Sequence, residues 1–188
     1  MDPKNLRKHY MHAVPKLNNA LKYVQDQLSD LPPSEFELET NVKPYTSVRR
    51  KMESLRTKDP LELSDLVRGR LFYSPQFKAE DTLDIVKKLF NDKVANVNNG
   101  AHRSKEHGLE YHGVVHVQLD VDGIKFELQL MPKEFKPYNE FLHQIYEKFR
   151  NPKTHDKLSD KQKELLRKLH NNLFKKLDKQ ADDDRANS

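Results

Sequence analysis

The chain has 188 residues and no cysteine, carries a net charge of +5, and 34% of its residues are charged. This length favours one domain that buries a core without disulfide bonds, and the lack of cysteine excludes thiolate catalysis and cysteine-bound zinc. No apolar run reaches the ~20 residues that span a membrane and the start is unlike a secretory signal, so we expect an intracellular protein with no membrane partner. The positive charge favours an anionic partner, either a nucleotide or a nucleic acid.

Residues 1–34 are predicted to form a packing helix and its exit. Apolar residues recur at three- and four-residue steps from Leu6 to Leu28, which gives the helix one apolar stripe. Pro15 lies inside this pattern, so we expect a kink or a break just before it.

Residues 35–150 alternate between strand and helix patterns, which predicts an α+β domain with a mixed sheet of about five strands flanked by helices. The expected strands are 36–43, 66–73, 94–97 and the two halves of 112–131. Helices are expected against the apolar side of the sheet, and the polar side of the hairpin is expected to be open.

Positive charge concentrates between residues 41 and 70, where eight lysines and arginines accompany four acids. A solvated basic face is the ordinary interpretation of such a run. Arg68 and Arg70 share one face of the second strand, however, and this arrangement favours nearby anions or acids. Asp65 stands at the entrance of that strand, and Gly69 indicates a bulge or a close backbone approach.

The hairpin between residues 112 and 131 has a single register that separates apolar from polar side chains. Asp122-Gly123 is a strong two-residue turn, and it fixes which residues lie opposite each other. On the apolar face the expected pairs are Val121 with Ile124, Leu119 with Phe126, Val117 with Leu128, and Val115 with Leu130. The other face is expected to carry His116, Gln118, Lys125, Glu127 and Gln129.

The C-terminal part is predicted to be helical. One helix is expected over 133–150, and a second, within 151–180, begins with a capping box at Ser159 and Gln162. Its apolar stripe is expected to pack on the domain or on a second subunit, which would make a homo-oligomer. Residues 181–188 are expected to be a disordered tail.

The chemistry left open is narrow, because the chain has no Walker loop, nucleophile elbow, zinc-protease motif or Rossmann fingerprint. Two acids near the sheet, Asp65 and Glu127, are surrounded by Lys43, Arg49, Arg50, Lys51, Arg68 and Arg70. Two carboxylates suit Mg²⁺, and the basic side chains would balance phosphate charge. This inventory favours phosphoryl or nucleotidyl transfer.

Four motifs resemble, in order and spacing, the synthetase domain of RelA/SpoT-type alarmone synthetases. They are VKPYTSVRRKM at 42–52, SDLVRGR at 64–70, His116, and FELQ at 126–129. The segment FLHQIYEKFR at 141–150 also looks like the helix after the catalytic strand in short or phage-associated members. The resemblance covers about 36–150. It implies a nucleotidyltransferase fold like that of DNA polymerase beta.

The resemblance also implies an activity, namely Mg²⁺-dependent transfer of pyrophosphate from ATP to the 3′-hydroxyl of an acceptor nucleotide. Asp65 would bind the metal, and Glu127 would bind it or accept the proton of the hydroxyl. The expected ATP and phosphate ligands are Lys43, Ser47, Arg50, Lys51, Arg68 and Arg70. The expected acceptor ligands are Lys105, Tyr111, His112, His116 and Gln129.

Departures from the family pattern keep the acceptor open. Asn41 stands where the family usually has arginine, and either Tyr111 or His112 takes the place of its base-stacking tyrosine. The acceptor is then GDP or GTP, an adenine nucleotide, or the 3′ end of a tRNA. We expect a cytoplasmic enzyme or an exported toxin acting in a target cell. The competing hypotheses are a non-catalytic basic module that binds nucleotide or RNA, and a structural protein that assembles through its last two helices.

Overall fold

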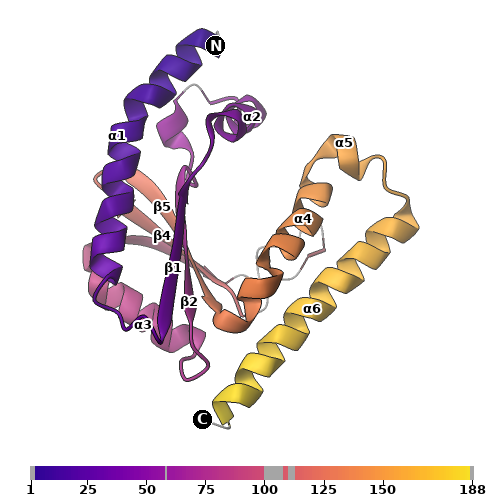
Figure 1. The fold of residues 1–188 in the computed structure, drawn as a ribbon. Helices are drawn as coiled ribbons and strands as arrows, with labels where there is room; N and C mark the ends of the chain where they lie inside the picture. The colour runs from indigo at the N-terminus through magenta and orange to yellow at the C-terminus, as the bar shows by residue number, and fades with distance from the viewer. Residues whose placement is uncertain (1–2, 58, 100–107, 110–112, 187–188) are drawn as a thin grey trace.

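The computed structural model describes residues 3–57, 59–99, 108–109 and 113–186, and a mixed five-stranded sheet lies at its centre (Figure 1). The strands are β1 (Phe36–Val42), β2 (Val67–Tyr73), β3 (Val94–Asn99), β4 (Val115–Val121) and β5 (Ile124–Pro132). Their order is β1-β2-β5-β4-β3, with β2 and β5 parallel and the other neighbours antiparallel. The predicted α+β fold with a five-stranded mixed sheet is therefore confirmed.

The β4–β5 hairpin has the register predicted from its alternation. Val121 pairs with Ile124, Leu119 with Phe126, Val117 with Leu128, His116 with Gln129, and Gln118 with Glu127. Asp122 and Gly123 have φ angles of 52° and 80°, as a primed hairpin turn requires. Turn chemistry and alternation select the same register, so every side chain lies on its expected face.

Helices α1 (Pro3–Leu28) and α3 (Ala79–Phe90) cover the apolar face of the sheet (Figure 1). Leu17 and Val24 of α1 are fully buried in this core together with Val86 of α3. Helix α1 continues through Pro15 without a break, so of the two alternatives, a kink or a break, the break is wrong. The apolar stripe from Leu6 to Leu28 runs on both sides of the proline, and packing on the sheet holds the two halves together.

A second layer, α4 (Asn139–Arg150) and α6 (Asp160–Ala186), lies on the opposite side of the sheet (Figure 1). The polar face was expected to be open, but one end of it is apolar. Phe72 continues the parity of Arg68 and Arg70 in β2, and it packs with Met131 of β5. These side chains meet Phe135 of the 3₁₀ turn before α4, together with Leu142, Phe174 and Leu177 of the second layer. The helices therefore cover one end of the face and leave its charged end accessible.

The start of helix α6 was predicted correctly, but its end was not. The capping box is confirmed, since Ser159 N donates to Gln162 Oε1 (2.9 Å) and Gln162 N donates to Ser159 Oγ (3.3 Å). The disordered tail is wrong for residues 181–186, which are helical. Ala181 lies one turn after Leu177, and both are buried, so the apolar stripe extends the helix.

The other helical elements of the described residues are shorter. They are α2 (Tyr45–Leu55), α5 (Pro152–His155), and the 3₁₀ turns η1 (Pro60–Glu62), η2 (Asn91–Lys93) and η4 (Lys133–Tyr138). Among the residues that the structure describes, no helix combines the length and the apolar character needed to cross a membrane.

Candidate active site

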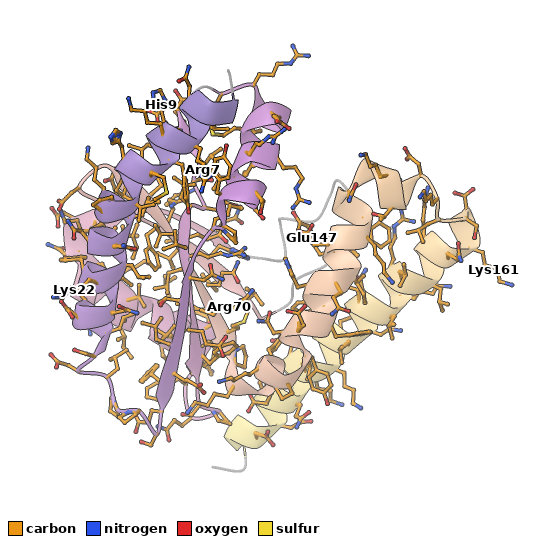
Figure 2. All side chains as sticks on the ribbon, turned by 45° about the horizontal axis from the view of Figure 1, so that its top comes forward. Arg7, His9, Lys22, Arg70, Glu147 and Lys161 are labelled. Carbon is orange, nitrogen blue, oxygen red and sulfur yellow. The ribbon has the colours of Figure 1, made fainter. Side chains whose placement is uncertain are left out.

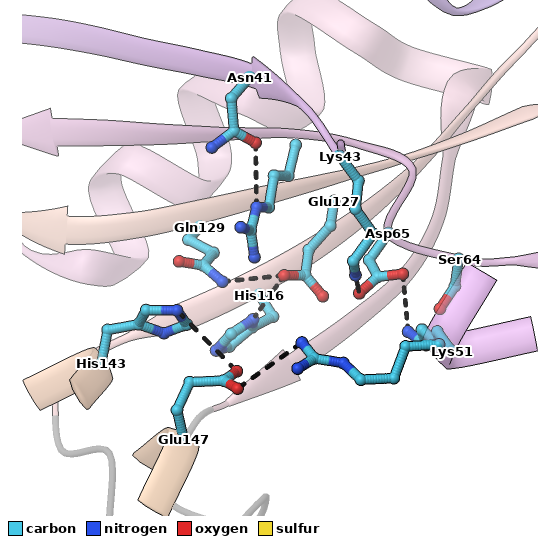
Figure 3. A network of polar contacts seen from close by, with 12 residues as sticks. Asn41, Lys43, Lys51, Ser64, Asp65, His116, Glu127, Gln129, His143 and Glu147 are labelled. Atoms are coloured by element: carbon cyan, nitrogen blue, oxygen red, sulfur yellow. Dashed lines mark hydrogen bonds and ion pairs between the residues drawn. The ribbon is translucent and has the colours of Figure 1, made fainter. Parts of the chain in front are cut away.

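Asp65 lies between two lysines at the charged end of the polar face (Figure 3). It stands in the turn before β2, and the β1–β2 register runs without a shift past Gly69. Asp65 is therefore outside the strand, and no bulge is needed to place it. Lys43 Nζ donates to Asp65 Oδ2, and Lys51 Nζ lies 2.6 Å from Asp65 Oδ1. Two segments that the sequence separates, β1–α2 and the entrance of β2, thus meet at one carboxylate.

The backbone of Lys43 is fixed from two directions. Its N–H donates to the Leu66 carbonyl (2.7 Å), and its own carbonyl accepts from Tyr10 Oη of α1 (2.7 Å). The Lys43 residue is only 5% exposed. Because its main chain is anchored to two other segments, Lys43 presents its ammonium group to the site from a rigid base.

Burial and the ion pairs act in opposite directions on this cluster. Burial lowers the pKa of Lys43, and its hydrogen bond with Asp65 partly offsets that effect. Burial raises the pKa of Asp65, but the hydrogen bonds from Lys43 and Lys51 outweigh it and hold the pKa below the ordinary 3.8. Asp65 is therefore a carboxylate at neutral pH, as a metal ligand must be.

Glu127 points from β5 onto the same face (Figure 3). Gln129 Nε2 donates to Glu127 Oε1 (2.8 Å), and His116 Nδ1 of β4 lies 3.9 Å from the same oxygen. Gln118, across the hairpin from Glu127, donates to the carbonyl of Ser64 (3.3 Å). The residue before Asp65 is thereby attached to the polar face of the hairpin, and both candidate acids face one region.

Two arginines line a pocket beside these acids. Arg68 Nε donates to Asn41 Oδ1 (3.0 Å), and Arg70 lies close to the side-chain amide of Asn139 at the start of α4. The pocket has a volume of about 350 Å³ and is lined by Glu39, Thr40, Asn41, Arg68, Gly69 and Arg70. Burial lowers the pKa of Arg70, and neighbouring Arg68 lowers it further. Two guanidinium groups so close together favour an anionic ligand between β1 and β2.

Asp65 and Glu127 are the two carboxylates predicted to ligate a cation, and Asp65 Oδ1 is the oxygen whose surroundings bear on that prediction. This buried oxygen lies 2.6 Å from the ammonium of Lys51, although the geometry of that contact is not that of a regular hydrogen bond. A cation that bound this oxygen would take the place of the Lys51 ammonium. Within the described part of the chain there is no cluster of three or more histidine and acidic side chains that could hold a metal by itself. Oxygen atoms from a substrate would have to complete the coordination shell.

No protein-family model matches the sequence, and no curated protein does either. Solved structures match over almost their whole length. Small alarmone synthetase 1 from Bacillus subtilis, bound to its product pppGpp, is 18% identical with a TM-score of 0.61, covering 95% of this chain and 94% of that one. The chain has the fold of the small alarmone synthetases.

Two further structures share that fold. A GTP pyrophosphokinase family protein from Streptococcus pneumoniae is 19% identical over all of this chain and 94% of its own, with a TM-score of 0.59. The Type VI effector Tas1, solved with its immunity protein, is 16% identical over 96% and 99% of the two chains, with a TM-score of 0.61. The resemblance predicted from short motifs is thus confirmed at the level of the alarmone synthetase fold.

Sequence reasoning missed two residues of α4 that face the sheet across the site (Figure 3). Glu147 lies with Oε2 3.9 Å from Arg50 of α2 and with Oε1 3.9 Å from His143, one turn earlier on α4. Figure 2 shows Arg70 on the sheet and Glu147 on α4 at the two sides of the site. The available signal was the i, i+4 spacing of His143 and Glu147, opposite the buried positions Leu142 and Ile145.

The remaining predicted site residues fall into two groups. Ser47 lies in the first turn of α2 with its side chain partly exposed, one turn before Lys51. Arg49 pairs with Glu53 on the exposed side of that helix (2.9 Å), away from Asp65. Lys105, Tyr111 and His112 lie outside the residues that the structure describes. Their acceptor-binding roles stay predictions.

Proposed function

We propose that the chain is an ATP-dependent pyrophosphokinase that transfers the β,γ-pyrophosphate of ATP to the 3′-hydroxyl of a nucleotide acceptor. The observation that supports this most is the placement of Asp65 and Glu127 on one polar face, among cationic side chains, in the fold of the small alarmone synthetases. A carboxylate pair ringed by lysine and arginine serves positioning and charge stabilisation, on which phosphoryl transfer depends.

The proposed step is an in-line displacement at the β-phosphorus of ATP. The 3′-oxygen of the acceptor forms a bond to this phosphorus, the bond to the oxygen bridging the α- and β-phosphates breaks, and AMP leaves. Glu127 accepts the proton of the 3′-hydroxyl, and Gln129 keeps that carboxylate oriented through its 2.8 Å hydrogen bond. The phosphate charge is offset by Lys43, Lys51, Arg50, Arg68 and Arg70, while the Ser47 hydroxyl donates to a phosphate oxygen.

Asp65 and Glu127 are the residues that would hold Mg²⁺. When bound, the ion would neutralise part of the triphosphate charge and fix its conformation. Glu127 can serve as a ligand or as the base, and only one of its oxygens accepts from Gln129 in the present arrangement.

In this proposal the acceptor side is formed by His116 and Gln129 together with the predicted ligands Lys105, Tyr111 and His112. His143 faces the same region from α4 and joins them. GDP or GTP, an adenine nucleotide and the 3′ end of a tRNA all present a 3′-hydroxyl beside a base. The structures with this fold include small alarmone synthetases and a Type VI effector, so the proposal covers both a cytoplasmic enzyme and an exported toxin.

The test is release of AMP from labelled ATP with Mg²⁺ and a panel of GDP, GTP, adenine nucleotides and tRNA. The wild-type chain should release AMP with at least one acceptor, and Glu127→Gln should not. Glu164→Gln, on the exposed surface of α6 beside Lys168, is the matched control. If no acceptor raises AMP release above the Glu127→Gln level, the chain is not a pyrophosphokinase.

The second candidate is a non-catalytic module that binds nucleotide or RNA through the same basic surface. The observation that favours this candidate is the pair Arg68 and Arg70 in the lining of the 350 Å³ pocket, because two guanidinium groups can bind an anion without any catalysis. Such a module would bind in a salt-sensitive manner, without Mg²⁺, and its binding would survive Glu127→Gln. The buried acids would then have no function in binding.

A further inference from the structure

Both oxygens of the proposed metal ligand Asp65 are already held by cations of the protein itself. Lys43 Nζ occupies Oδ2, and Lys51 Nζ lies 2.6 Å from Oδ1. The Asp65 side chain is 14% exposed, and those of Lys43 and Lys51 are 6% and 20% exposed. A divalent ion that approached this carboxylate would meet two ammonium groups at contact distance, and like charges so close repel strongly in a partly buried site.

We infer that Lys43 and Lys51 act as placeholder cations for the metal ion, and that the nucleotide's phosphates must draw them off Asp65 before the metal can bind. This inference rests on the proposed function, since it takes the ligand of the lysines to be the triphosphate. It assigns an order to the site, with phosphate binding first and metal ligation second.

The surroundings allow the side chains to move while the main chain stays in place. Lys43 is anchored at its N–H by Leu66 and at its carbonyl by Tyr10, so only its flexible stem can swing. Lys51 projects from α2, whose Val48 and Met52 are buried in the core and fix the helix. Arg68 adds a third positive charge close enough to act on Lys43, so the cationic side chains Lys43, Lys51 and Arg68 outnumber the two acids, Asp65 and Glu127, in this part of the site. That excess favours a polyanion over a cation as the first ligand.

The first experiment titrates the nucleotide-free full chain with Mn²⁺ alone, followed by the electron paramagnetic resonance signal of free Mn²⁺. Wild type should bind weakly. Lys51→Met and Lys43→Met should bind at least about tenfold more tightly, because each removes a positive charge next to the ligand. Adding Asp65→Asn to either variant should abolish the gain. Circular dichroism and thermal unfolding check folding, and Lys51→Met carries the test if the more buried Lys43 variant does not fold.

Lys93→Met is the charge-matched control, because Lys93 pairs with Asp122 at the hairpin turn (3.6 Å), on another element. It should leave Mn²⁺ binding at the wild-type level. Equal affinity of wild type and Lys51→Met would overturn the inference, and so would an equal gain from Lys93→Met.

A second experiment uses the wild-type chain and α,β-methylene-ATP in isothermal titration calorimetry. The analogue should bind in EDTA with an affinity within about tenfold of that in Mg²⁺, since the lysines that hold phosphate need no metal. Binding that requires Mg²⁺ would contradict the order. Absence of binding under both conditions would instead overturn the proposed ATP site, and the Mn²⁺ titration would then decide the role of the lysines.

Discussion

The two faces of β5 carry different kinds of residue and serve different ends. Phe126, Leu128 and Leu130 have no exposed surface and lie in the main core under α1 and α3. Glu127 and Gln129, between them in sequence, project to the other face, where Gln129 donates to Glu127 and His116 lies 3.9 Å from Glu127. One strand therefore contributes to stability through one parity and to the proposed chemistry through the other. Substitutions one residue apart in β5 should therefore affect different properties, namely stability on one face and activity on the other.

The largest expected effect is on the polar face. Glu127→Gln should reduce AMP release by about 10²- to 10⁴-fold, because a carboxamide cannot accept the proton of the hydroxyl. Its free energy of unfolding should stay close to that of wild type, since the amide keeps the size of the side chain. Enzyme assays and urea denaturation measure the two quantities on one sample. A large loss of stability would show that the two faces do not separate as described.

On the apolar face, Leu128→Ala should do the reverse. Removing a fully buried leucine side chain from the main core should lower the free energy of unfolding by about 2–5 kcal/mol. Activity per folded molecule should change much less than in Glu127→Gln. Gln129→Ala is the neighbouring control, and urea denaturation should find its stability within about 1 kcal/mol of wild type.

Gly69 provides a finer test of the same core. A Cβ at this position would lie 3.3 Å from Leu128 Cδ1 and 3.3 Å from two ring atoms of Phe126. Gly69→Ala should therefore overpack the core and destabilise the chain by about 1–3 kcal/mol. In a double-mutant cycle, Leu128→Ala should relieve part of that loss by making room. Additive effects in urea denaturation would mean that the methyl group does not press on Leu128.

The sequence predicted the hairpin and its faces because local rules suffice there. Turn residues at Asp122-Gly123 and strict alternation admit one register, so Glu127 and Gln129 were placed correctly. The close approach at Gly69 was one of two expected options, and the structure decides it. The face on which a strand residue lies can therefore be predicted from a single sequence.

Tertiary contacts were not predictable in the same way. Lys43 and Lys51 were expected near phosphate, but their shared contact with Asp65 depends on how α1, α2 and β2 pack. Glu147 and His143 were seen as part of a helix, and nothing local shows that this helix faces the sheet. Composition favoured disorder after residue 180, yet burial of Ala181 outweighed it. In each case the deciding term was packing between distant segments.

The smallest expected effect is at His143, on the side of the site that faces the sheet. Burial lowers its pKa below the ordinary 6.5, Glu147 and Glu140 partly offset this, and Arg68 and Arg70 lower it further. The unfolded chain therefore binds more protons than the folded chain as the pH falls below 6.5, so the free energy of unfolding decreases with falling pH in that window. The side chain is 35% exposed, so solvent screens the effect and keeps it small.

His143→Asn should remove this titrating group, so the free energy of unfolding should depend less on pH just below 6.5. Thermal unfolding across a pH series measures it, with His9→Asn on the exposed side of α1 as the control for loss of a histidine. An unchanged pH dependence in His143→Asn would mean that His143 keeps an ordinary proton affinity. In that case α4 would pack on this side of the sheet without an electrostatic effect of the β2 arginines on His143.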